Sequence, residues 1–285
     1  GGGGFEIWQY TSRKPQPASF QPILGDLGIN ICKMKTRDIH ASFKNFDKTY
    51  LLSKEIEKTP HGTPHFWVKD PYGNKFQVIE SDNWFSKNSN DTGGVFGAII
   101  GVSNIEKSIQ FYTDILDYDT IEWQGEGNFN DLTPLNPKKH QYKRVILSHS
   151  KNRKGSFSQL LGSSQIELIE NLTETGKNIY QDRYWGDLGF IHLCFDVVGM
   201  EALREECKEA GHPFTVDSAN SFDMGEAAGH FSYIEDPDGT LIEFVETHKI
   251  PILKKIGWYL DIRKRDALKP LPRWMVKSMG LNKKK

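Results

Sequence analysis

A carboxylate stands in the middle of a predicted strand that is otherwise largely apolar. The stretch DPDGTLIEFVE (Asp236–Glu246) predicts a tight turn followed by a strand that begins at Thr240. Because side chains alternate along a strand, Glu243 shares one face with Leu241 and Val245. A carboxylate between two large apolar side chains must either reach water or meet a cation. Glu243 is therefore the first residue that the sequence marks for chemistry.

The motif that contains this strand occurs twice in the chain. DPYGNKFQVIE (Asp70–Glu80) resembles DPDGTLIEFVE, and upstream of it LGDLG (Leu24–Gly28) resembles WGDLG (Trp185–Gly189), 161 residues later. At the same offset, Glu6 in FEIWQY corresponds to Glu167 in QIELIE. Motifs that recur in the same order along the chain indicate that it contains two related halves.

Each half divides again into segments that begin with a strand and a helix. Gly97–Asp119 predicts a short apolar strand and then a helix that Ser103 or Asn104 can cap, and His192–Gly211 repeats this plan. Further strands follow each helix, so the repeating module is β-α-β-β-β. The closing strand of the last two modules carries Glu167 and Glu243, respectively.

These modules predict an α+β fold of cupped mixed sheets in two halves. Residues 1–90 form a first half that is incomplete at its N-terminus, with the last strand of one module (Phe5–Tyr10) and one complete module (Leu27–Glu80). Residues 91–248 form a second half with two complete modules. Residues 249–285 form a basic C-terminal tail that lies outside the repeat.

Charge is distributed unevenly along the chain. The formal net charge is −1, but the tail from Lys249 holds twelve Lys and Arg residues against two Asp residues. A tail of this kind can dock on the acidic body, on a membrane surface or on nucleic acid. The structural alternative is a C-terminal helix that packs its Trp and Leu residues on the domain. The tail lacks the alternation of aromatic and basic residues typical of a nucleic-acid platform, so we expect no nucleic-acid partner.

Composition limits the other partners and the compartment. The three cysteines show no CxxC spacing, which disfavours a disulfide framework and a cysteine zinc site and favours a reducing compartment. No apolar run approaches the roughly 18 residues of a membrane span, and no signal peptide is visible. We therefore expect a cytoplasmic protein without an integral membrane segment. The sequence leaves a homodimer open.

Three motifs together resemble the vicinal oxygen chelate superfamily, which includes glyoxalase I, methylmalonyl-CoA epimerase, extradiol dioxygenases and the fosfomycin and bleomycin resistance proteins. The motifs are GVSNIEKSIQFYTDILDYD, IHLCFDV and YIEDPDGTLIEFVE, and the resemblance covers nearly all of Phe5–Thr247. The resemblance implies that two β-α-β-β-β modules pair to form a cup around a divalent metal ion. It also implies a small-molecule substrate that coordinates this ion.

The resemblance assigns four positions of the second half to metal ligands. These positions hold Gly97, Glu167, His192 and Glu243, of which all but Gly97 can bind a metal. Two carboxylates and one imidazole suit Fe, Mn, Ni, Co or Zn, and three protein ligands leave positions open for water and substrate. The resemblance further implies that Glu167 or Glu243 carries a proton during the reaction.

Two more residues of the second half match the extradiol enzymes of the family. Tyr233 lies where those enzymes carry a tyrosine that contacts substrate. The histidine that accompanies it falls near Met224, so we expect His230 to stand in for it. In the first half Ile31 and Gln77 replace His192 and Glu243, and we expect no metal there.

These expectations favour a metal-dependent enzyme that binds vicinal oxygens of a small substrate. Its chemistry would be of the isomerase or lyase type through a metal-stabilised enolate, or oxygen-dependent ring cleavage. The alternative is a non-catalytic protein that sequesters a small molecule, as resistance proteins of the family do. A third hypothesis makes the chain an interaction module that its basic tail delivers to a surface.

Overall fold

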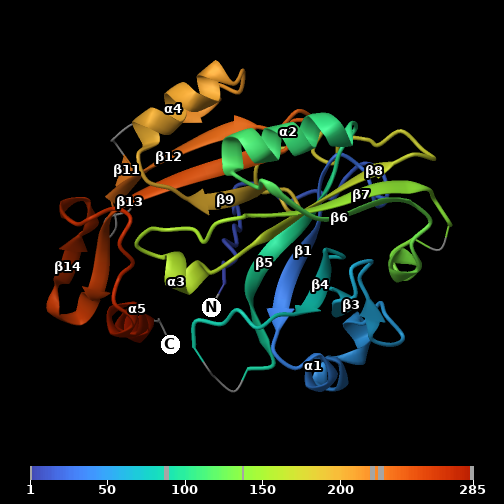
Figure 1. Cartoon of the computed structure of the whole chain (residues 1–285), viewed down its shortest axis with the longest axis horizontal. Coiled ribbons are helices and arrows are strands. Elements are labelled where there is room, and N and C mark those ends of the chain that lie inside the picture. The colour runs from blue at the N-terminus through green and yellow to red at the C-terminus, as the bar shows by residue number, and fades with distance from the viewer. Residues whose placement is uncertain (1, 87–89, 137, 219–221, 224–227, 283–285) are drawn as a thin grey trace. The chain divides into compact units, whose positions relative to one another are not determined.

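The computed structural model describes residues 2–86, 90–136, 138–218, 222–223 and 228–282. The chain forms two compact units, and Figure 1 shows their helices and strands. Unit 1 comprises Gly1–Lys151, Ser163–Ile191 and Pro237–Thr240. Unit 2 comprises Asn152–Gly162, His192–Asp236 and Leu241–Lys285. No helix of the described ranges is long and apolar enough to cross a lipid bilayer.

Unit 1 contains an eight-stranded mixed sheet built from two consecutive modules. The strand order is β2-β3-β4-β1-β5-β8-β7-β6. The bounds are β1 (Gly28–Thr36), β2 (Glu57–Lys58), β3 (Pro64–Lys69), β4 (Lys75–Glu80), β5 (Thr92–Gly101), β6 (Thr120–Gly127), β7 (Tyr142–Ser148) and β8 (Gln165–Asn171). The helices of the two modules are α1 (Ile39–Asn45) and α2 (Ile105–Leu116), and one-turn 3₁₀ helices follow at Lys48–Tyr50 and Asn130–Leu132. Both modules therefore have the predicted β-α-β-β-β order.

The two modules join where β1 and β5 pair in antiparallel fashion, with Ile31 opposite Ile99. Within each module the first and last strands pair in parallel, β1 with β4 and β5 with β8. The predicted division at residue 90 thus falls between β4 and β5 of one continuous sheet. The compact unit is accordingly formed by the complete module of the first half together with the first module of the second half.

Short-range sequence signals explain where the helices of unit 1 begin. The Asp38 side chain accepts a hydrogen bond from the backbone N–H of Ala41 at the start of α1, and Asn104 does the same for Lys107 at the start of α2. Of the two predicted caps for the second helix, the residue used is Asn104. Helix α2 packs against β7 and β8 (Figure 1).

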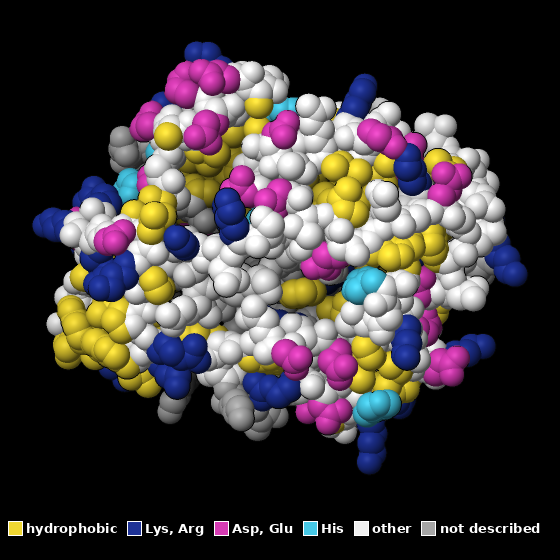
Figure 2. Space-filling view, viewed as in Figure 1, with side chains coloured by type: hydrophobic (Ala, Val, Ile, Leu, Met, Phe, Trp, Pro, Cys, Tyr) yellow, Lys and Arg dark blue, Asp and Glu magenta, His cyan; other side chains and the backbone are white. Residues whose placement is uncertain are grey.

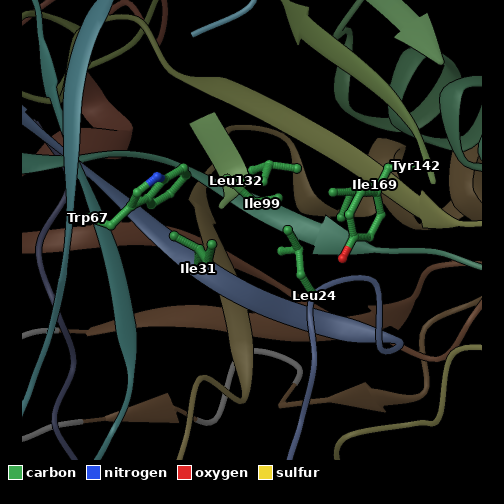
Figure 3. Close-up of a cluster of buried hydrophobic side chains, with 7 residues drawn as sticks. All are labelled: Leu24, Ile31, Trp67, Ile99, Leu132, Tyr142 and Ile169. Carbon is green, nitrogen blue, oxygen red and sulfur yellow. The ribbon is translucent and has the colours of Figure 1, made fainter. Parts of the chain in front are cut away.

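One hydrophobic cluster of unit 1 lies on one face of its sheet, and a second, which includes Phe66 and Val78, lies on the other. Strand alternation turns Ile31, Trp67 and Ile99 to the first of these faces, where loop residues cover them. Figure 3 shows the cluster as one group of side chains: Leu24, Ile31, Trp67, Ile99, Leu132, Tyr142 and Ile169. The Trp67 indole N–H donates to the backbone oxygen of Asp131 over 2.6 Å, which ties the loop to the sheet. Packed side chains therefore fill this part of the face.

Unit 2 contains a six-stranded sheet built around the last module. Its strands are β9 (His192–Asp196), β10 (Val216–Asp217), β11 (Phe222–Asp223), β12 (Ala228–Glu235), β13 (Leu241–Leu253) and β14 (Trp258–Asp261). The path runs β10-β12-β13-β14, β9 pairs in parallel with β13, and β11 pairs with β12. The α-helices are α3 (Ser158–Leu161), α4 (Met200–Glu209) and α5 (Arg273–Met279), and one-turn 3₁₀ helices lie at Lys254–Ile256, Ile262–Lys264 and Gly280–Asn282.

Two local predictions differ from the structure. Phe5–Tyr10 is not a strand, because none of its backbone pairs with a neighbour; the nearest bridge joins Gly3 to Val95. The tail is not mainly helical either. Strand β13 continues to Leu253 and turns back into β14, and only Arg273–Met279 forms an α-helix.

Candidate functional site

Unit 2 brings the predicted residues His192 and Glu243 together on neighbouring strands. His192 opens β9 and Glu243 lies near the start of β13, and in the parallel register Cys194 lies opposite Glu243. The two side chains therefore share one face of the sheet, and the imidazole Nε2 lies 3.1 Å from the carboxylate Oε2. Both side chains are largely buried. The carboxylate in the apolar strand thus has an imidazole as its partner.

Tyr233 completes this group from the other side of β13. It lies directly opposite Glu243 in the antiparallel pair of β12 and β13, and its ring stands edge-on to the His192 ring with centroids 5.6 Å apart. Burial disfavours the charged form of Glu243, but hydrogen bonds from His192 and Tyr233 outweigh it and lower the pKa of the carboxyl. Glu243 is therefore held as a carboxylate at neutral pH.

The donor atoms of this pair suit a divalent cation. Transition metals bind imidazole nitrogen and carboxylate oxygen at about 2.0–2.2 Å, so two adjacent ligands of one ion lie about 3 Å apart. The Nε2–Oε2 separation of 3.1 Å meets this condition without a change of strand register. An imidazole and a carboxylate are also acceptable to Fe, Mn, Ni, Co and Zn. His192 and Glu243 therefore fit a metal ion as two adjacent ligands.

His230 does not join this group. It lies three residues before Tyr233 on β12, and an odd separation along a strand turns a side chain to the opposite face. There its Nε2 lies 2.6 Å from Oδ1 of Asp217, whose carboxylate also pairs with Arg204. The prediction that His230 takes the place of the histidine that accompanies this tyrosine in extradiol enzymes is therefore wrong. Met224, the position that this partner would occupy, lies outside the described residues.

Glu167 is found in unit 1, fully buried between two cations. Its Oε2 lies 2.7 Å from the Lys33 ammonium, and its Oε1 accepts hydrogen bonds from the Arg144 guanidinium at 2.6 and 2.9 Å. Burial raises the pKa of Glu167, but the charges of Arg144 and Lys33 outweigh it and lower the pKa to about 2. Both carboxylate oxygens are therefore already bound to protein cations.

Two more side chains extend this cluster. Arg144 also binds Asp131, with Nη1 2.9 Å from Oδ1 and Nη2 3.1 Å from Oδ2, and Lys33 donates to Oε1 of Gln165 over 2.6 Å. Burial lowers the pKa of Lys33, and the attraction of Glu167 opposes that effect. We name these five residues the Lys33 cluster. Two positive and two negative charges balance within it.

The Lys33 cluster gives Glu167 a different role from the predicted one. A divalent cation at Glu167 would have to displace or approach two fixed positive charges in a buried site, which is electrostatically costly. We therefore do not include Glu167 among the metal ligands or proton carriers proposed below. Sequence reasoning missed Lys33 and Arg144, although each stands in an apolar strand, in NICKMKT and YKRVILS, as Glu243 does.

Gly97, the fourth position of the predicted ligand set, has a steric reason to lack a side chain. It lies on β5 opposite Gln165 of β8, and a Cβ added there would be 1.8 Å from the Gln165 backbone oxygen. Any larger residue would force the two strands apart. The close packing of β5 against β8 in unit 1 therefore explains why position 97 carries no ligand side chain.

This contact predicts the effect of adding one methyl group. Gly97→Ala is expected to destabilise the protein by about 1–3 kcal/mol, because the backbone must shift to accommodate the Cβ. The matched control is Gly4→Ala, since a Cβ at Gly4 meets nothing within 4 Å. Urea unfolding followed by circular dichroism measures both variants. Equal stabilities for the two would contradict the steric explanation.

Comparisons with known proteins agree with the fold. Residues 95–244 match the family model described as Glyoxalase/Bleomycin resistance protein/Dioxygenase superfamily. This match spans about half of the chain and runs from β5 into β13, so it includes Tyr233, His192 and Glu243. No curated protein sequence matches the chain.

Several solved structures are similar to the chain at low sequence identity. Glyoxalase I from Zea mays is 16% identical with a TM-score of 0.49, and the alignment covers 79% of this chain and 69% of that one. A protein from Bacillus subtilis described as a candidate dioxygenase is 15% identical with a TM-score of 0.49, covering 80% and 64%. A glyoxalase family protein from Bacillus cereus is 14% identical with a TM-score of 0.37, covering 53% and 90%.

Proposed function

The chain belongs to the Glyoxalase/Bleomycin resistance protein/Dioxygenase superfamily, and from this premise we propose that it is a metal-dependent enzyme acting on a small substrate with neighbouring oxygens. The ligands are His192 and Glu243 of unit 2. The observation that carries this proposal is the 3.1 Å separation of their donor atoms within one face of the sheet. Two protein ligands would leave coordination positions of a bound ion open to water and to substrate oxygens.

The residues around this pair have separate tasks. A bound divalent ion supplies Lewis-acid polarisation of a substrate carbonyl, which suits isomerase, lyase or ring-cleaving chemistry. Glu243 remains ionised because its hydrogen bonds lower its pKa, so it contributes a full negative charge to the site. Tyr233 hydrogen-bonds to Glu243 and thereby fixes the direction of its carboxylate. The Tyr233 hydroxyl, a donor to this carboxylate, can also turn to donate to a substrate oxygen.

Metal analysis of the purified protein tests the proposal. We expect about one equivalent of a divalent ion per chain after reconstitution with Mn, Fe, Ni, Co or Zn and removal of excess metal. Less than about 0.1 equivalent with every one of these ions would exclude a resident metal.

A second candidate function rests on the two predicted ligand positions in unit 1, because neither offers a side chain that is free to bind a metal. Gly97 has no room for a side chain and Glu167 is bound by Lys33 and Arg144. This loss favours a non-catalytic protein that binds and sequesters a small molecule. That function predicts thermal stabilisation by a ligand that is the same with and without a chelator. The enzyme predicts that a chelator removes the stabilisation.

A further inference from the structure

Unit 2 exposes a pair of tryptophans beside a large aliphatic side chain. Trp258 opens β14 and Trp274 lies in α5; their rings are 6.3 Å apart, and their exposed fractions are 40% and 58%. Ile256, two residues before Trp258 in the turn between β13 and β14, is 72% exposed. We call Ile256, Trp258 and Trp274 the hairpin patch. Large apolar side chains that are exposed close to one another indicate an interaction surface.

The hairpin patch is not needed for the core beneath it. Ile252 of β13, Leu271 before α5, and Met275 and Val276 of α5 are buried, and α5 packs against β13. These contacts fix the hairpin and the helix without the two indoles. Gly257 turns the chain in the left-handed region at φ 67°, which presents Ile256 and Trp258 at the tip of the hairpin.

Basic residues surround the hairpin patch. Lys254 and Lys255 precede Ile256 at the hairpin tip, and Arg273 and Lys277 flank Trp274 on α5; all four side chains are exposed. Of the two acidic residues in the whole tail, Asp261 is ion-paired with Arg263 over 2.7 Å. Figure 2 shows hydrophobic side chains gathered over β14 with Lys and Arg beside them. The surface is therefore apolar at its centre and cationic around it.

We propose that the hairpin patch binds the surface of an anionic lipid bilayer. Exposed tryptophans favour the headgroup region, where the ring is buried and the indole N–H stays hydrated. Lysine and arginine around an apolar centre match the negative potential of such a surface. A second copy of this chain fits less well because two equally cationic surfaces repel each other. Duplex nucleic acid offers no apolar surface to Ile256 and the indoles.

Sedimentation with vesicles tests the proposal on the full chain. We expect most of the protein to pellet with vesicles of about 30 mol% phosphatidylserine in phosphatidylcholine, and little with phosphatidylcholine alone. Raising the salt to about 0.5 M should weaken binding, because exposed charges are then screened. Brominated lipid should quench tryptophan fluorescence in the wild type. Absence of binding to the anionic vesicles at low salt would overturn the proposal.

Two variants separate the apolar and the charged contributions. Trp258→Ser with Trp274→Ser, and separately Lys254→Glu with Lys255→Glu, should each weaken vesicle binding by about tenfold or more. The controls are Trp8→Ser, at an indole 53% exposed in unit 1, and Lys151→Glu with Lys154→Glu, which changes the net charge equally.

The pattern of losses decides the outcome. If the controls weaken binding as much as the hairpin variants, binding does not reside in the hairpin patch and the proposal is overturned. Self-association that the Trp258 and Trp274 substitutions abolish, without vesicle binding, would assign the patch to a homodimer instead. Binding to duplex DNA but not to vesicles would likewise overturn it. The lysine variants lie in an exposed turn, so they remain informative if the tryptophan variants unfold.

Discussion

Replacing Glu243 with glutamine is expected to reduce divalent-metal affinity by about 100-fold or more and to abolish any metal-dependent turnover. Loss of a residue that only orients a ligand already costs about 10–100-fold, and Glu243 is proposed to be a ligand itself. Glutamine keeps the shape of the side chain but removes the negative charge that hydrogen bonds from His192 and Tyr233 stabilise. His192→Ala should have an effect of the same order, because it removes the only nitrogen ligand.

Calorimetric metal titration, with circular dichroism to confirm folding, measures this effect. The matched control is Glu246→Gln, on the same strand β13 but on its other face, where Glu246 accepts a hydrogen bond from the Gly199 backbone. This control should bind metal as the wild type does. Tyr233→Phe should also retain the metal but lower turnover. Wild-type affinity in Glu243→Gln would contradict the proposed ligand set.

Replacing Lys33 with methionine should destabilise the protein by about 3–5 kcal/mol, because removing one partner of a buried ion pair leaves the other charge uncompensated. Both Lys33 and Glu167 are fully buried, and their charged atoms lie 2.7 Å apart. Arg144 would then be the one cation of the cluster beside Glu167, and its guanidinium also donates hydrogen bonds to Asp131. Urea unfolding with fluorescence detection measures the loss. A change below about 1 kcal/mol would show that Lys33 does not stabilise Glu167.

Two controls separate burial from charge. Lys143→Met removes a partly exposed lysine on the same sheet, paired with Glu106, and should cost less than about 1 kcal/mol. Lys33→Met combined with Glu167→Met removes both charges and should recover most of the loss, since apolar pairs often replace buried ion pairs without cost.

The pH dependence of stability gives an independent readout of the same pair. The folded pKa of Glu167 is lowered to about 2 from an ordinary value of 4.5, so its stabilising contribution is complete above pH 4.5. That contribution is lost as pH falls from 4.5 towards 2. In Lys33→Met the folded pKa should rise, and this acid-induced loss of stability should become smaller.

The modules themselves could be predicted from the sequence because their signals are local. The cap at Asn104, the apolar strands and the repeated turn motif each act over a few residues, and the order of elements in the three complete modules follows them. Strand alternation marks Glu243 alone, whereas the resemblance to the superfamily adds His192 and Tyr233 to it. The structure brings these three residues together.

The pairing of modules could not be predicted in the same way. The antiparallel contact of β1 with β5 joins residues about 70 positions apart along the chain, such as Ile31 and Ile99, and no local pattern encodes it. Lys33 and Arg144 were missed for a related reason. A charged residue in a strand usually faces water, and only the three-dimensional arrangement shows that these two are buried beside Glu167.

X-ray absorption at the metal edge of reconstituted protein tests the metal centre most directly. The proposal predicts one imidazole ring in the scattering shells, with nitrogen and oxygen ligands at about 2.0–2.2 Å, and loss of the ring signal in His192→Ala. A first shell of oxygen alone in the wild type, or an imidazole signal that persists unchanged in His192→Ala, would contradict a metal ion held by His192 and Glu243.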